Sequence, residues 1–191
     1  MNFKKFAICT SIIIGIIVVT MVVLGCVHIN NKLEIDTPTS YVVYLKSSAG
    51  KEYTEETHPS KYKKFNELLN NSTNLNVFDY MAKGLSLDAK ASQDYSNQFV
   101  DWKEANKAEN VCLEMVFDKK QTMVVNVQGN TKVVEFYSLI MQVDSSSRAS
   151  RVALYFSNST GSVKNYQEKN PICVVMKQSK LYKFLNSLSE N

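Results

Sequence analysis

The fold is decided by residues 111–143, which read VCLEMVFDKKQTMVVNVQGNTKVVEFYSLIMQV. Apolar residues recur at every second position at the start of this stretch, which is the spacing of a half-buried strand. Gly129-Asn130 is a strong two-residue hairpin signal between apolar runs. The stretch therefore predicts strands at 111–117, 121–128 and 131–143, with the charged residues 118–120 as the turn between the first two.

The flanking sequence adds strands and amphipathic helices to this hairpin. Further strands are predicted at 41–46, 152–156 and 172–177, where β-branched and aromatic residues are dense. His58-Pro59-Ser60 opens a helix that ends at Asn70-Asn71, because proline is favoured in the first helical turn. A final helix begins near Ser179. Shorter helices are expected to carry Leu75, Phe78, Met81, Ala82 and Leu85, and Tyr95, Phe99 and Trp102.

These elements predict an α+β fold. A mainly antiparallel sheet has one apolar face, and the amphipathic helices are expected to cover it. The strand at 41–46 and the strand at 172–177 are each followed by an amphipathic helix, so we expect the two helices to lie side by side on the sheet. The domain is assigned to residues 41–191.

The N-terminus carries a long apolar segment. No charged residue occurs among the 22 residues from Phe6 to Val27. A helix of this length rises about 33 Å, enough to cross a hydrocarbon core of about 30 Å. Lys4 and Lys5 place residues 1–5 in the cytoplasm by the positive-inside rule. We therefore expect a single-pass signal anchor at 6–27, a linker at 28–40 and an extracytoplasmic domain behind it.

A second interpretation of the same segment remains open. Val23-Leu24-Gly25-Cys26 resembles a bacterial lipobox, in which the cysteine is lipidated and becomes the new N-terminus. The resemblance covers four residues, and Leu24 is bulkier than is usual at its position. It implies a lipoprotein signal peptide that ends at Cys26. Together with 20 lysines against two arginines, it favours a bacterial cell-envelope protein.

Motifs for catalysis, cofactors and metals are absent from the sequence. It holds no nucleophile elbow, no phosphate-binding loop, no dinucleotide-binding glycine motif and no zinc-protease motif. His58 is the one histidine far from the apolar segment, and its position before Pro59 suits a helix start. Glu55 and Glu56 are expected to be solvated. The part of the chain after the apolar segment carries a net charge of +2, which is too balanced for an electrostatic nucleic-acid binder.

Two sets of residues carry open alternatives. Cys112 and Cys173 are expected on the sheet face away from the helices, either as separate small buried residues or, if their strands are neighbours, as a disulfide. Tyr95, Phe99 and Trp102 share a helical face, which is either core or an interaction surface.

The leading functional hypothesis is a membrane-anchored, extracytoplasmic, non-enzymatic binding domain. Its expected partners are the membrane, reached through the helix or a lipid, and an envelope protein or peptide. One alternative is an envelope hydrolase or transferase with a site that the sequence does not reveal. Another is an accessory subunit of a membrane complex, whose membrane helix contacts a partner helix. We expect no cofactor.

Overall fold

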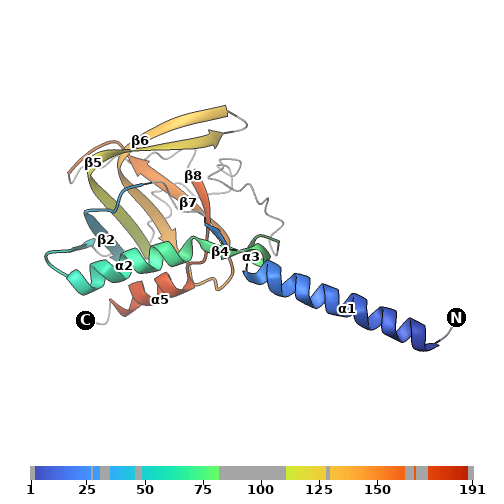
Figure 1. Ribbon diagram of the computed structural model, residues 1–191. Helices are drawn as coiled ribbons and strands as arrows, with labels where there is room; N and C mark the ends of the chain where they lie inside the picture. Colours follow the sequence, from blue (N-terminus) through green and yellow to red (C-terminus); the bar gives the residue numbers. More distant parts are fainter. Residues whose placement is uncertain are drawn as a thin grey trace.

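The computed structural model describes residues 3–26, 28–30, 35–45, 49–81, 111–127, 130–161, 166 and 172–188. It shows an α+β domain with a long N-terminal helix that extends away from it (Figure 1). The helices of the described residues are α1 (Phe3–Cys26), α2 (Pro59–Ser72), α3 (Val77–Met81) and α5 (Ser179–Ser187).

The centre of the domain is a six-stranded sheet in the order β3-β2-β5-β6-β7-β8, and every neighbouring pair in it is antiparallel. Its strands are β2 (Ser40–Leu45), β3 (Lys51–Thr54), β5 (Val111–Val127), β6 (Asn130–Val143), β7 (Ser150–Ser157) and β8 (Ile172–Met176). The predicted α+β class and the antiparallel sheet are confirmed.

The helices α2 and α5 lie side by side across one face of this sheet, as the sequence predicted (Figure 1). Phe65 of α2 is completely buried at their junction with the sheet. Its ring centroid lies 4.8 Å from that of Tyr41 on β2 and 5.0 Å from that of Phe184 on α5. One aromatic side chain therefore ties both helices to the sheet.

The predicted turn at residues 118–120 is wrong. β5 runs without reversal from Val111 to Val127, and its register with β6 shifts between Val116 and Gln121. The intervening residues form a bulge because Phe117 is buried while Asp118, Lys119 and Lys120 are exposed. A bulge lets Phe117 stay buried and the three charged residues stay exposed without ending the strand. The charged triplet, whose composition is typical of a turn, therefore lies within β5.

Part of the predicted linker is structured. β1 (His28–Asn30) directly follows the end of α1 and pairs with β4 (Asn74–Asn76), a strand where the sequence analysis expected a helix. Among the described residues the helix in this region is α3; Ala82 and Leu85 of the expected helix, and the predicted helix at Tyr95–Trp102, lie outside the described residues. The β1–β4 ladder joins α1 closely to the domain.

The packing of α3 on α1 strengthens this joint. A Cβ atom added at Gly25 of α1 would lie 3.2 Å from Cε2 of Phe78, so the Phe78 ring rests directly on the glycine. Asp79 of α3 forms a 2.6 Å ion pair with Lys177, which follows β8. We call Gly25, Phe78 and the β1–β4 ladder the joint.

Truncating Phe65 should weaken the whole domain. Phe65→Ala removes contacts to β2 and α5 together, and we expect the free energy of unfolding to fall by about 3–5 kcal/mol. Phe65→Leu keeps most of the volume and should cost less. Urea unfolding of the full chain in detergent, followed by circular dichroism, measures both; Asn71→Ala, on the exposed face of α2, is the control. Equal stability of Phe65→Ala and Asn71→Ala would contradict this assignment of the core.

Candidate functional site

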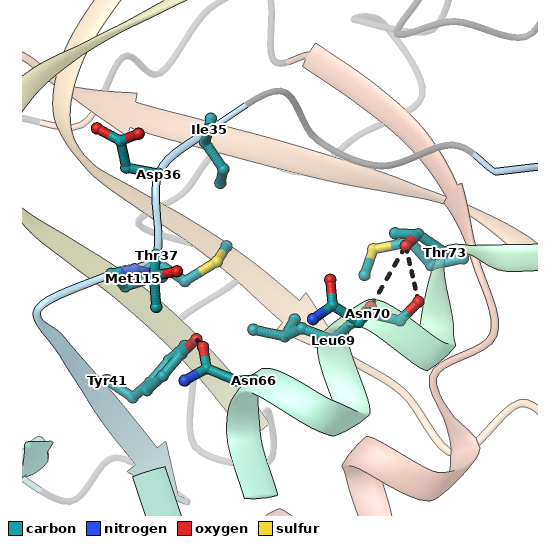
Figure 2. A pocket seen from close by; sticks show the side chains of 11 residues that line it. Ile35, Asp36, Thr37, Tyr41, Asn66, Leu69, Asn70, Thr73 and Met115 are labelled. Carbon is teal, nitrogen blue, oxygen red and sulfur yellow. Dashed lines mark hydrogen bonds between the residues drawn. The ribbon is translucent and has the colours of Figure 1, made fainter. Parts of the chain in front are cut away.

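A cavity of about 110 Å³ lies between α2, the sheet and the segment Ile35–Pro38, which precedes β2. Figure 2 shows Asn66, Leu69 and Asn70 directed from α2 toward that segment. We call this cavity the α2 pocket. Its lining is completed by Tyr41, Thr73, Met115 and Met176.

Hydrogen bonds hold the wall formed by Ile35–Pro38 in place. Gln121, which is buried on β5, accepts a 3.0 Å bond from the Asp36 backbone N–H at Oε1 and donates a 3.1 Å bond to the Asp36 carboxylate through Nε2. The Tyr62 hydroxyl donates to the carbonyl of Pro38. The Thr39 backbone N–H donates a 2.8 Å bond to the carbonyl of Val116. This segment was predicted as linker, yet it is a fixed wall of the pocket.

Apart from the Asp36 carboxylate, the polar groups that line the α2 pocket are uncharged. The Asp36 carboxylate accepts a hydrogen bond from the neutral Gln121 amide. Burial, and secondarily the neighbouring Tyr62, raises the pKa of the Tyr41 hydroxyl above its ordinary value, so Tyr41 remains a neutral donor to Oδ1 of Asn66. The other polar lining groups are the hydroxyls of Thr37 and Thr73 and the amide of Asn70.

The floor of the pocket is apolar. Met115 and Met176 are buried, and Leu69 packs against the same core. Ligand pockets for drug-sized molecules are usually about 300–1,000 Å³, so this smaller cavity suits a single side chain. Primary amides such as Asn70 can both donate and accept, which matches the N–H and C=O groups of a peptide main chain. The arrangement is suited to holding an extended peptide by one apolar side chain.

The opposite face of the sheet carries a hydroxyl–carboxylate cluster. Glu114 of β5 is 1% exposed, and the Tyr44 hydroxyl donates a 2.7 Å bond to its Oε2 atom. Tyr166 also hydrogen-bonds Glu114, and its hydroxyl lies 3.2 Å from Oγ of Ser138. Burial is the main cause that raises the pKa of both tyrosines, and the Glu114 carboxylate adds to it. Both therefore stay neutral and stabilise the buried carboxylate.

The predicted cysteines lie on strands that are not neighbours. Cys112 is a buried free thiol on the face away from α2 and α5, and burial raises its pKa to about 12, which leaves little reactive thiolate. Cys173 lies on β8, and both β6 and β7 separate that strand from β5. Three strand spacings amount to about 14 Å, whereas disulfides need Cα atoms within about 7 Å. A Cys112–Cys173 disulfide would require β5 and β8 to be neighbouring strands, and they are not.

The other predicted site residues are placed without forming a shared site. Cys26 is exposed at the last residue of α1. His58 precedes α2, where its ring packs edge-on against Tyr53 at 5.0 Å, and Glu55 and Glu56 are exposed in the preceding turn. Tyr95, Phe99 and Trp102 lie outside the described residues. Within the described part of the chain, no three His, Cys, Asp or Glu side chains are grouped to hold a metal ion.

Comparisons with known proteins give no match: no protein-family model, no curated protein and no solved structure resembles this chain significantly. The function is therefore inferred from the α2 pocket, the joint and α1 alone.

Replacing Gln121 should release the pocket wall. Gln121→Ala removes both bonds to Asp36, and we expect a loss of about 1–3 kcal/mol in stability together with faster hydrogen exchange at the Asp36 amide. Gln121→Glu should loosen the wall further, because it sets a second carboxylate beside that of Asp36. Hydrogen exchange of the full chain in detergent checks this, with Thr122→Ala, an exposed neighbour, as control. An unchanged Asp36 exchange rate in Gln121→Ala would contradict the role given to this side chain.

Proposed function

We propose that this chain is a membrane-anchored, extracytoplasmic protein of the bacterial cell envelope, and that its domain binds a peptide without transforming it. The α2 pocket carries the proposal. Its rim offers neutral hydroxyl and amide groups, its floor is apolar, and its one carboxylate is engaged by Gln121. Such a lining recognises an uncharged polar main chain and an apolar side chain, and it supplies no activated nucleophile.

The anchor part of the proposal rests on α1. This helix is long and apolar enough to cross a membrane, and no residue of Cys9–Cys26 is buried. A signal sequence passes the same test of length and composition. Retention of α1 is supported by the joint, because cleavage before Cys26 would remove Gly25, on which Phe78 packs. With Lys4 and Lys5 in the cytoplasm, the domain lies outside the membrane.

The pocket and the anchor are also close along the chain. Thr73 lines the α2 pocket, and β4 begins at the next residue. Asn74–Asn76 pair with His28–Asn30, which follow α1 after one residue. A peptide held against the C-terminal end of α2 would therefore lie beside the connection to the membrane helix. This arrangement suits a domain that captures its partner near the membrane surface.

Peptide selection tests the binding function. A phage-displayed library of random heptapeptides is panned against the full chain in lipid nanodiscs, and selected peptides are synthesised for affinity measurement. We expect peptides with one apolar anchor residue. Asn70→Ala should weaken them about tenfold, the effect of losing roughly 1.4 kcal/mol of amide hydrogen bonding. Thr37→Trp, which fills the rim, should abolish binding.

The matched control is Asn71→Ala, which changes the same residue type at the adjacent position, outside the pocket lining. It should bind like the unaltered chain. Equal effects of Asn70→Ala and Asn71→Ala, or peptides that tolerate Thr37→Trp, would contradict the proposed site. Mass spectrometry of a selected peptide after incubation separates binding from hydrolysis: an intact peptide is expected, and cleavage products would favour an envelope hydrolase.

A further inference from the structure

A second cavity lies on the sheet face opposite to α2 and α5. Its volume is about 740 Å³, and its lining comes from β2, β3, β5, β6 and the turn after β7. Pockets for small organic molecules usually measure about 300–1,000 Å³. We call this space the acidic cavity, because Glu52, Glu114 and Asp118 belong to its lining. It is large enough for a small ligand, whereas the α2 pocket suits a single side chain.

The strand register places two of these carboxylates on the same side of the sheet. Val42 of β2 pairs with Glu52 of β3 and also with Glu114 of β5. Directly paired residues of antiparallel strands project from one face, and two strand spacings separate the Cα atoms of the two acids by about 10 Å. The described lining includes no lysine, arginine or histidine. A cleft lined by one sign of charge concentrates counter-ions, so the acidic cavity favours a cation.

Two lysines close to these acids in the sequence are engaged elsewhere. Lys51 precedes Glu52, and successive strand residues point to opposite faces. The Lys51 ammonium lies 5.8 Å from the ring centroid of Tyr53, which belongs to the core under α2. Lys120, in the bulge of β5, pairs with Glu135 at 3.2 Å. Neither lysine is part of the cavity lining, so neither ammonium group occupies the acidic cavity.

Tyrosines supply the aromatic part of the lining, through Tyr44, Tyr137 and Tyr166. The Tyr44 hydroxyl donates a 2.7 Å bond to Glu114, and Tyr166 also hydrogen-bonds this carboxylate, which is 1% exposed. The buried charge is therefore held in a fixed position. A cation within about 6 Å of a tyrosine ring centroid is attracted by the ring electrons. Carboxylates and tyrosine rings together recognise an alkylated ammonium group, because the carboxylates balance its charge and the rings contact its alkyl carbons.

A close approach of the main chain fixes one wall of the acidic cavity. A Cβ atom added at Gly50, which precedes β3, would lie 2.6 Å from Cε1 of Tyr44 and 2.6 Å from Cγ1 of Val42. Glycine permits this approach because it has no side chain. Gly50 on one side and the hydrogen bond to Glu114 therefore hold the Tyr44 ring in place. A wall that is already ordered reduces the entropy lost when a ligand binds.

We propose that the acidic cavity is a second binding site, which takes a small organic ammonium ion with alkyl substituents. The exposed carboxylates of Glu52 and Asp118 and the buried carboxylate of Glu114 balance its charge. The tyrosine rings contact its alkyl groups. The site lies across the sheet from the α2 pocket, so it goes beyond the proposed peptide binding and does not depend on it.

Choline and its uncharged isostere, dimethylbutanol, test the site directly. Both have the same shape, and only choline carries the positive charge. The full chain is titrated with each compound in a maltoside detergent, which contains no ammonium group, and binding is followed by saturation-transfer difference NMR of the methyl signals. We expect saturable binding of choline and none of the isostere. Absence of saturable choline binding, or equal binding of the isostere, overturns the proposal.

Exposed positions locate the site without disturbing the buried Glu114. Glu52→Gln and Asp118→Asn should each weaken choline binding about fivefold, the effect expected for one charge about 4 Å away in a hydrated rim. Tyr137→Leu should weaken it about twofold to fivefold through loss of the ring. Glu56→Gln, which makes the same charge change in the turn before α2 and outside the lining, is the control.

Circular dichroism establishes that each variant is folded before it is titrated. Choline should bind Glu56→Gln as tightly as it binds the unaltered chain. Equal affinity of Glu52→Gln, Asp118→Asn and Glu56→Gln for choline would overturn the assignment of the ammonium ion to the acidic cavity.

Discussion

The structure depends on covering the apolar face of a six-stranded antiparallel sheet. Two helices that lie far apart in the sequence, α2 and α5, do this together, and Phe65 joins them to β2 through stacked and edge-on ring contacts. Burial of such faces is the main favourable term in folding. Because α2 must lie across the sheet to provide it, its Asn66, Leu69 and Asn70 side chains come to face the segment Ile35–Pro38. The α2 pocket is thus a consequence of the way the core is closed.

The same helix also connects the core to α1. The chain leaves α2 at Thr73, enters β4 and pairs there with β1, which follows the membrane-length helix. Phe78 against Gly25 and Lys177 against Asp79 add an apolar and an ionic contact around this joint. Anchor, pocket and core are therefore parts of one connected unit. In the proposed function, this connection would hold a peptide bound in the α2 pocket at a short distance from the membrane.

Much of the fold could be predicted from periodicity. Alternation from Val111 to Phe117, the Gly129-Asn130 turn and the amphipathic spacing of α2 and α5 indicated these elements and their arrangement. The errors came from short or mixed segments. Asn74–Asn76 pairs with β1 through its backbone, which leaves no side-chain pattern, and Asp118–Lys120 forms a bulge although its composition is typical of a turn.

The candidate site was less accessible to sequence reasoning. Asn66 and Asn70 look like ordinary solvent-facing residues of an amphipathic helix, and Ile35–Pro38 look like linker. Their role depends on Gln121, which lies 85 positions from Asp36 and holds Ile35–Pro38 in place as the pocket wall opposite α2. Glu114 occupies an ordinary alternating position of the strand predicted at 111–117. Its partners Tyr44 and Tyr166 come from distant parts of the chain, which no local pattern reveals.

The central claim is that α1 remains part of the mature protein and is joined to the domain by Gly25, Phe78 and the β1–β4 ladder. Intact mass spectrometry of the protein purified from bacterial membranes tests it most directly. The account predicts the mass of the complete 191-residue chain, 21.6 kDa, with no lipid attached. A mass lacking the first 25 residues and carrying a lipid on Cys26 would contradict it and would identify a lipoprotein instead.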